Sequence, residues 1–515
     1  MRADNGDTVI TSGERVVTAS DWRGVAHRAA AGFLALGLKP GFTVAVMLRN
    51  DLAFFEAMEA ARVAGACFVP VNWHLTAREV DYILEDAQAD VLVIHADLLA
   101  GTKAGLKHDP KVLVVPVPDE IRWAYGLDDD QCRIVDTYDE WYGWLSEFEP
   151  LAAADHENGS FMLYTSGTTG HPKGVRREAQ AAEETAVYLD SIMAAFGLRL
   201  QARTVVTGPL YHAGPLGYAR AVLRAQGSML MMPRFDPEQL LQIIEAERIT
   251  HMHVVPIMFV RLLRLPAAVR NRYDLRSLEC VIHGAAACPV DIKRQIIDWW
   301  GPVIREYYGS TEASIGCAVG SHDWLSHPGT VGQPLPGIKL AIFDHDGHRL
   351  PAGEIGEIHY RQSLAPNFDY HNRSAERVAI ERQGLLSNGD LGYQDEEGFV
   401  YLCGRSKEMI ISGGVNIYPA EIEAALLTHS GVADCAVYGV PDDEFGESVH
   451  AAVQPVPGQS LEREELLAHL NGRIAKFKWP RELHFHAALP RADNGKVYKQ
   501  LLHELAQRKS ADETS

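Results

Sequence analysis

Residues 164–174 read Tyr-Thr-Ser-Gly-Thr-Thr-Gly-His-Pro-Lys-Gly, and this stretch is the strongest indication of a fold in the chain. Its glycines permit positive φ angles and let backbone N–H groups approach an anion. Its hydroxyls add neutral donors, and Lys173 adds a charge suited to phosphate oxygens. Such clusters also mark ordinary surface loops. The usual phosphate loop is excluded, because His171 and Pro172 separate the lysine from the preceding glycine. The stretch therefore predicts a nucleotide site of another architecture.

The same stretch resembles the signature loop of the adenylate-forming superfamily, which includes acyl-CoA synthetases, luciferases and the adenylation domains of peptide synthetases. In that family the loop holds the β- and γ-phosphates of ATP while a carboxylate attacks the α-phosphate. The resemblance implies that Thr165 also binds Mg²⁺. The ATP contacts it implies are Thr165, Ser166, Gly167, Thr168, Thr169, Gly170 and Lys173.

Length and composition are those of an ordinary soluble globular protein with several domains: 515 residues, 47% hydrophobic and 23% charged. The net charge of −20 argues against binding to nucleic acid or an anionic membrane. No apolar run is long enough for a transmembrane helix. Seven cysteines without a C-x-x-C pattern indicate reduced thiols rather than disulfides or zinc. With neither a secretory nor a peroxisomal signal, we expect a cytoplasmic protein.

Short apolar runs alternate with helical patterns through the first 350 residues, as in the runs 42–48 and 91–94 and the helical pattern 237–247. This alternation predicts an α/β fold with largely parallel sheets. Near residue 400 the pattern changes to that of a compact α+β unit. We therefore predict a large N-terminal domain, residues 1–404, and a small mobile C-terminal domain, residues 405–515.

The segment Tyr307-Tyr-Gly-Ser-Thr-Glu312 offers an aromatic ring that could stack on adenine and a carboxylate that could hold Mg²⁺. Taken alone, such a turn is more often structural. In the superfamily, the second tyrosine stacks on adenine and the glutamate coordinates Mg²⁺, which implies these roles for Tyr308 and Glu312. The resemblance extends to the turn after His283. The further ATP-site residues it implies are Gly284, Ala285, Ala286, Tyr307, Gly309, Ser310 and Thr311.

Two later motifs match the family in order along the chain. Asp390, in a glycine-flanked turn, corresponds to the acid that accepts hydrogen bonds from the ribose hydroxyls, and Arg405 to the arginine that contacts ribose and phosphate. On its own, Asp390 would be read as a capping residue. The family's hinge falls at Lys407. The resemblance implies that the turn Ser412-Gly413-Gly414 lines the pantetheine channel of CoA after the small domain rotates.

Lys496 follows an Asn-Gly pair near the end of the chain and would ordinarily be a solvated turn residue. In the family this lysine bridges the carboxylate and the α-phosphate during adenylation. His212 aligns with the aromatic residue beside the acyl carboxylate. The aspartate that pairs with a substrate amine is not matched, so we expect no α-amino acid substrate. Small residues predict a roomy acyl pocket beside His212: Gly214, Gly217, Gly309, Ala313 and Gly316.

The resemblance thus implies an acyl-CoA synthetase with Lys173, His212, Glu312 and Lys496 as catalytic residues. A hydrophobic carboxylic acid and Mg·ATP would give acyl-adenylate and pyrophosphate, and rotation about Lys407 would then admit the CoA thiol. Fatty, aromatic and steroid side-chain acids all remain open as substrates. One alternative is transfer to a carrier protein instead of CoA. Another is a non-catalytic nucleotide-binding protein. A homodimer is the default expectation for the oligomeric state.

Overall fold

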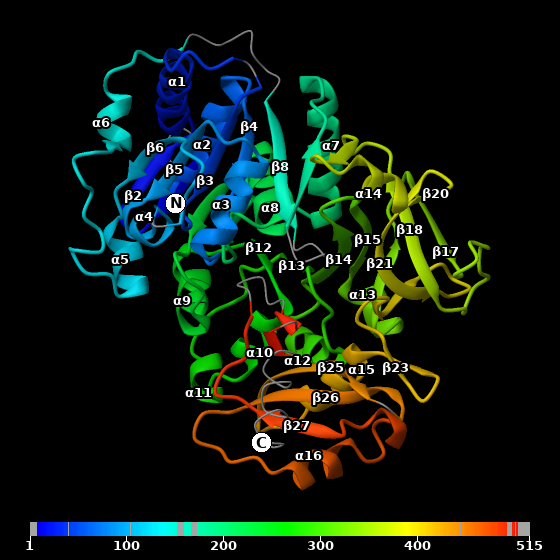
Figure 1. Cartoon of the computed structure of the whole chain (residues 1–515). Helices are drawn as coiled ribbons and strands as arrows, with labels where there is room; N and C mark the ends of the chain where they lie inside the picture. The colour runs from blue at the N-terminus through cyan, green and yellow to red at the C-terminus, as the bar shows by residue number, and fades with distance from the viewer. Residues whose placement is uncertain are drawn as a thin grey trace, which may run out of the picture.

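The computed structural model describes residues 8–39, 41–103, 105–151, 159–165, 172–442, 444–491, 497–499 and 501–502. Within them the strands form two large sheets and one small sheet. Figure 1 shows the two large sheets side by side, with the small sheet and its helices, coloured orange to red, packed below them. The predicted fold class, a mixed α/β protein with a small C-terminal unit, is confirmed.

The first large sheet has the strand order β19-β9-β8-β4-β3-β5-β6-β7 and is parallel from β7 to β8. Its central strands are continuous apolar runs because helices cover both faces. Asp51 begins α2 by accepting a hydrogen bond from the Leu52 N–H at 2.6 Å. The elements are β3 (Thr43–Met47), β4 (Cys67–Pro70), β5 (Val91–His95), β6 (Lys111–Val115), β7 (Asp139–Glu140), β8 (Ser160–Thr165), β9 (Lys173–Arg177), β19 (Phe368–Tyr370), α1 (Ala19–Ala35), α2 (Leu52–Val63), α3 (Ala77–Asp86), α4 (Ala96–Lys103), α5 (Asp119–Tyr125) and α6 (Trp141–Leu145).

The second large sheet contains a parallel half in the order β14-β13-β12-β10-β11-β1, with β2 antiparallel at its edge. The crossover helices between these strands match the predicted alternation. The elements are β1 (Val9–Ser12), β2 (Arg15–Thr18), β10 (Arg203–Val206), β11 (Ser228–Met231), β12 (His251–Val254), β13 (Cys280–His283), β14 (Ile304–Ser310), α7 (Ala182–Phe196), α8 (Ala213–Arg224), α9 (Pro237–Glu247), α10 (Pro256–Leu263), α11 (Ala267–Arg270) and α12 (Val290–Trp300).

The same sheet continues past β14 as an antiparallel half that the alternation pattern did not predict. Its strands are joined by short turns for most of its length, so the periodic helix signal of a parallel sheet is missing. The elements are β15 (Ser314–Gly320), β16 (Thr330–Pro334), β17 (Ile338–Phe343), β18 (Gly356–Gln362), β20 (Glu381–Arg382), β21 (Leu385–Gln394), β22 (Val400–Arg405), α13 (Ser321–Ser326) and α14 (Ser374–Ala379).

The small sheet has the order β24-β23-β26-β25, with β27 parallel to β26, and α15 and α16 pack against it around Ile422 and Leu466. The chain leaves the second large sheet at Arg405, the last residue of β22, and enters the small sheet at Ile410, the first residue of β23. The domain boundary at residue 404 stays a prediction. The elements are β23 (Ile410–Ser412), β24 (Val415–Ile417), β25 (Val432–Asp442), β26 (Gly446–Pro455), β27 (Glu482–Phe485), α15 (Pro419–Leu427), α16 (Arg463–Leu470) and the 3₁₀ turn η1 (Lys476–Lys478).

One contact joins the small domain to the large one at the end of α10. The Arg264 guanidinium, at the C-terminus of that helix, donates hydrogen bonds to the carbonyl oxygens of Val432 and Ala433 at the start of β25. The large domain thus holds a strand of the small sheet through its backbone. Among the helices that the structure describes, none is long and apolar enough to cross a membrane.

Candidate active site

Three side chains, one each from β14, β21 and β22, meet beside the end of β14. The Tyr308 hydroxyl donates to Asp390 Oδ2 at 2.9 Å, and Arg405 Nε donates to Asp390 Oδ1 at 3.1 Å. Arg405 lies opposite Asp390 because β21 and β22 are paired in that register. Asp390 is only 9% exposed. Burial and the Asp390 charge together raise the pKa of Tyr308 well above its usual value, so its hydroxyl keeps the proton it donates. The residues predicted for adenine and ribose are therefore gathered in one place.

The turn after β13 carries the predicted adenine-facing residues Gly284, Ala285 and Ala286. A Cβ on Gly284 would lie 2.4 Å from Cε1 of Tyr307, so the tyrosine ring leaves room only for glycine. Ala285 has a φ of 69°, in the left-handed region that residues with a Cβ rarely adopt. Ala285 and Ala286 are both exposed. Backbone strain of this kind is concentrated at functional sites, which agrees with the role predicted for this turn.

The turn that follows β14 orients the predicted metal ligand. Ser310 Oγ accepts a hydrogen bond from the Ala313 N–H at 2.9 Å, and the Thr311 carbonyl accepts one from Arg177 at 2.7 Å. Glu312 Oε1 accepts a hydrogen bond from the Tyr370 hydroxyl at 3.0 Å. In the described part of the chain, Glu312 Oε2 has no hydrogen-bond partner. A carboxylate with one free oxygen suits Mg²⁺, which prefers oxygen ligands and retains several waters.

The predicted phosphate loop connects β8 to β9, which form an antiparallel pair with Thr165 opposite Lys173. Ser166, Gly167, Thr168, Thr169 and Gly170 lie outside the described residues. Lys173 Nζ forms an ion pair with Glu376 Oε2 and lies 5.2 Å from the centroid of the Tyr370 ring. This pairing lowers the pKa of Glu376, and Lys407 contributes through its charge. The lysine predicted to bind phosphate is therefore paired with a carboxylate.

The predicted acyl residues lie around the N-terminus of α8, where His212 is the N-cap residue. A Cβ on Gly214 would lie 2.7 Å from the Tyr307 hydroxyl, so this glycine provides room for a tyrosine. A Cβ on Gly217 would meet no atom within 4 Å, so open space is found there. Backbone fills the space beside Gly309, and the Tyr360 ring fills that beside Gly316. Ala313 is buried beside them. Of the predicted glycines, only Gly217 faces open space.

A buried hydrogen bond lies beneath Gly214. The Tyr307 hydroxyl and His253 Nε2 are 3.0 Å apart, and the rings of Phe196 and Tyr218 surround them. Burial lowers the pKa of His253 to about 4, so the imidazole is neutral at pH 7. Burial also raises the pKa of the Tyr307 hydroxyl. The acyl side of the site thus has an aromatic wall that contains one neutral polar pair.

In the small domain, Ser412, Gly413 and Gly414 form the turn between β23 and β24, with Ser412 paired to Val415. The φ angles of Gly413 and Gly414 are +58° and +77°, as a two-residue hairpin turn requires. The predicted hinge, Lys407, lies in the turn between β22 and β23. That turn is closed by hydrogen bonds from the Glu408 and Met409 N–H groups to the Arg405 carbonyl.

Lys496 lies outside the described residues. Residues on either side of it are held by ion pairs within the small domain. Arg491 forms two hydrogen bonds of 2.5 Å with Asp434, and Lys499 lies 3.0 Å from Glu408 and 3.1 Å from Glu423. Because Glu408 follows the predicted hinge residue directly, Lys499 lies next to that hinge.

Four residues of the site were not predicted: His253, Tyr370, Glu376 and Arg264. Each contacts a predicted residue or the small domain from a distant part of the sequence. No local motif surrounds any of them, so only the fold could identify them.

Comparisons with known proteins agree with this geometry. Residues 2–365 match the family model described as AMP-binding enzyme, and residues 421–496 match its C-terminal domain. A feruloyl-CoA synthase from Amycolatopsis sp. is 32% identical over 499 residues, which cover 96% of this chain and 94% of that protein. An indoleacetate–CoA ligase from Aromatoleum aromaticum is 32% identical over 520 residues, covering 98% of this chain and 96% of that protein.

A solved structure, ATP-bound MatB from Rhodopseudomonas palustris, has a TM-score of 0.81 at 28% identity and covers 98% of this chain and 97% of its own. The family matches span both domains, and the sequence relatives extend over nearly the full chain. The chain belongs to the AMP-binding, adenylate-forming enzyme family, among the acyl-CoA ligases.

Proposed function

We propose that this protein joins a hydrophobic carboxylic acid to CoA in two steps. In the first, a carboxylate oxygen attacks the α-phosphorus of ATP, the bond to pyrophosphate breaks, and acyl-adenylate forms. In the second, the CoA thiol attacks the acyl carbon, loses its proton, and AMP leaves. The observation that carries the proposal is the meeting of Tyr308, Asp390 and Arg405, which come from three separate motifs of the sequence.

In the first step, different residues would contact different parts of ATP. Asp390 would accept hydrogen bonds from the ribose, and Tyr308 would stack on adenine. Lys173 and Lys496 would contact phosphate oxygens as their charge is redistributed. Mg²⁺, when bound, would neutralise part of that charge, and Thr165 and Glu312 are the residues proposed to hold it. In the second step, rotation about Lys407 would remove Lys496 and bring Ser412, Gly413 and Gly414 to the pantetheine arm.

The acyl side supports a hydrophobic substrate. Aromatic rings line the space beneath α8, and Gly217 faces open space. Relatives named for feruloyl and indoleacetate substrates agree with a ring-bearing acid. His212, as the N-cap residue of α8, would lie beside the acyl carboxylate. We place the protein in the cytoplasm, where ATP and CoA are both available.

A screen for pyrophosphate release tests this proposal. The purified protein is incubated with Mg·ATP and a panel of aromatic, fatty and polycyclic acids, with and without CoA. We expect pyrophosphate release that depends on the acid, and acyl-CoA when CoA is present. Acid-dependent pyrophosphate release without a CoA thioester would instead favour transfer to a carrier protein, which is checked with a phosphopantetheinylated carrier. No acid-dependent release with any acid would contradict the proposal.

A further inference from the structure

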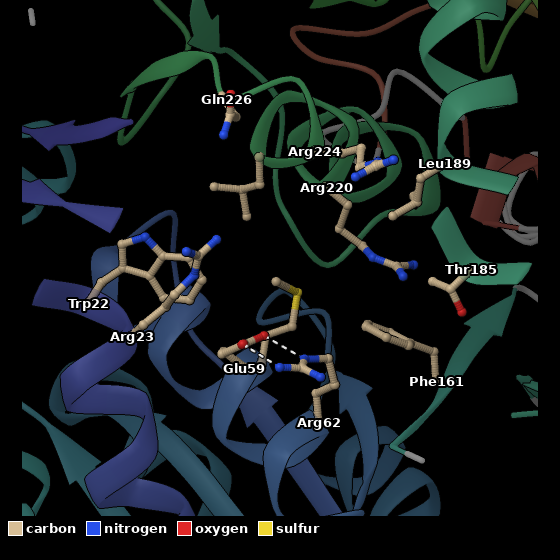
Figure 2. A pocket seen from close by; sticks show the side chains of 12 residues that line it. Trp22, Arg23, Glu59, Arg62, Phe161, Thr185, Leu189, Arg220, Arg224 and Gln226 are labelled. Atoms are coloured by element: carbon tan, nitrogen blue, oxygen red, sulfur yellow. Dashed lines mark hydrogen bonds and ion pairs between the residues drawn. The ribbon is translucent and has the colours of Figure 1, made fainter. Parts of the chain in front are cut away.

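A second cavity, of about 340 Å³, lies between the α1–α2 pair and the α7–α8 pair (Figure 2). None of the predicted site residues is among those that line it. Arg220 and Arg224 line it from α8, and they follow His212, the N-cap residue of the same helix, by eight and twelve positions. At a rise of about 1.5 Å per residue, they lie roughly 12 and 18 Å along the helix from His212.

The lining combines apolar surface with an excess of positive charge. Four arginines contribute to it, against a single lining carboxylate, that of Glu59. Glu59 is already engaged by Arg62 through two hydrogen bonds of 2.8 and 2.7 Å. Arg224 is paired with Asp190 at 2.9 and 3.1 Å, and Arg23 is exposed. In a chain with a net charge of −20, this is a locally cationic place.

Arg220 is partly buried and has no acidic partner among the described residues, a lack that it shares with the exposed Arg23. The Arg220 guanidinium carbon lies 4.3 Å from the centroid of the Phe161 ring, and Figure 2 shows Arg220 extending from α8 toward that ring. It forms no hydrogen bond or ion pair with any residue that the structure describes. Burial lowers its pKa. A guanidinium stacked on an aromatic ring keeps its N–H edges available in a fixed plane, which suits a two-point contact with a carboxylate.

Trp22 contributes part of the wall of this cavity. It lines the cavity with only 3% of its surface exposed, and its indole N–H has no hydrogen-bond partner among the described residues. A buried donor without an acceptor costs free energy. The remaining apolar wall comes from Met58, Phe161, Leu189 and Leu223. The cavity therefore offers the Arg220 guanidinium fork beside a largely apolar wall.

We propose that this cavity binds a hydrophobic monocarboxylate, with its carboxylate on Arg220 and its apolar body against Trp22, Met58, Phe161 and Leu223. The Arg220 guanidinium matches a carboxylate in charge and geometry. The volume falls in the range of small-molecule sites. This inference does not depend on the proposed function, because binding here requires neither ATP nor CoA.

Photolabelling with peptide mapping tests the proposal and separates this cavity from the acyl pocket. The probe is a ten-carbon carboxylic acid with a diazirine in its alkyl chain, used without ATP or CoA. We expect labelled peptides that contain Met58, Phe161 or Leu223. The methyl ester of the same probe should label them about tenfold less, because it lacks the charge that strengthens a hydrogen bond to arginine. Equal labelling by acid and ester in the unmodified protein would overturn the proposal, whatever the variants do.

Matched variants identify the residue responsible. Arg220→Met should reduce acid labelling of these peptides about tenfold, and Arg220→Lys, which keeps the charge but lacks the fork, should give an intermediate loss. The control is Arg276→Met, because Arg276 is 89% exposed and lies away from the cavity, paired with Asp274. Unchanged labelling in a folded Arg220→Met protein would contradict the assignment. Stronger labelling by the alkyl phosphate of the same chain would show that the headgroup is not a carboxylate.

Discussion

The two sides of the candidate active site differ in how firmly their polar side chains are already paired within the protein. On the β14 side, defined by Tyr307, Tyr308, His253, Asp390 and Arg405, each side chain already has a buried or half-buried partner. Two consecutive tyrosines of β14 contact different partners: Tyr308 contacts Asp390, the acid proposed to bind ribose, and Tyr307 contacts His253.

On the hairpin side, defined by Lys173, Glu312, Tyr370 and Glu376, the lysine is paired with a carboxylate that is 37% exposed. With the proposed roles, a phosphate would have to compete with Glu376 for Lys173, whereas the ribose would meet Asp390, which is already held by Arg405. We infer that the nucleoside half of ATP is recognised by a rigid surface and the phosphate half by an ion pair that has to exchange. The predictions below separate these contributions, beginning with the largest.

Lys496→Ala should lower the rate of adenylation about 100- to 1,000-fold, because it removes a charge from the phosphate where negative charge is redistributed. Thioester formation from a supplied acyl-adenylate should be nearly unchanged, since the lysine is expected to act only in the first step. Both half-reactions are measured separately, by pyrophosphate release and by acyl-CoA formation. An equal loss in the two would contradict the assigned rotation. Lys478→Ala, in the same domain and paired with Glu421, is the control.

Asp390→Asn should raise the KM for ATP about 10- to 100-fold, because it weakens charged hydrogen bonds to the ribose and leaves Arg405 without its anionic partner. Unlike the lysine variant, it should also impair the second half-reaction, since acyl-adenylate carries the same ribose. The KM values for ATP and for acyl-adenylate are the measurements. Asp346→Asn is the matched control, because Asp346 is 60% exposed. A defect confined to the first half-reaction would show that Asp390 does not hold the ribose.

His253→Gln should weaken the dependence of stability on pH. The folded-state pKa of His253, about 4, is below the unfolded value of 6.5, so the unfolded chain binds more protons between these limits. The free energy of unfolding therefore falls as the pH drops from 7 to 5, by up to about 1.4 kcal/mol for each pH unit below 6.5. Glutamine keeps a partner for Tyr307 but does not titrate. Urea unfolding at pH 7 and pH 5 measures this slope, and His345→Gln, an exposed histidine, should leave it unchanged.

The sequence predicts best those parts of the site that depend on local motifs. The helix at 237–247 has the predicted bounds, because proline marks its first turn. The pairing of Tyr307 with His253 spans 54 positions and follows from the register of β12, β13 and β14, which no local pattern specifies. The same applies to Lys173 and Glu376. The small size of Gly214 predicted space for substrate, but a tyrosine hydroxyl fills it. A glycine in the sequence indicates that some group approaches its backbone closely, but it does not identify that group.

Glu376→Gln should have the smallest effect on the KM for ATP. It is also the variant that tests most directly whether the two sides of the site differ. If Glu376 competes with phosphate for Lys173, its neutralisation should lower the KM for ATP about two- to fivefold, the modest effect typical of partly exposed ion pairs. The lower KM should also rise more steeply with salt, since salt no longer weakens a competing ion pair at the same time. Glu354→Gln, an exposed glutamate elsewhere, is the control. A higher KM would mean that Glu376 holds Lys173 in position for phosphate, and the hairpin side would then be as prearranged as the β14 side.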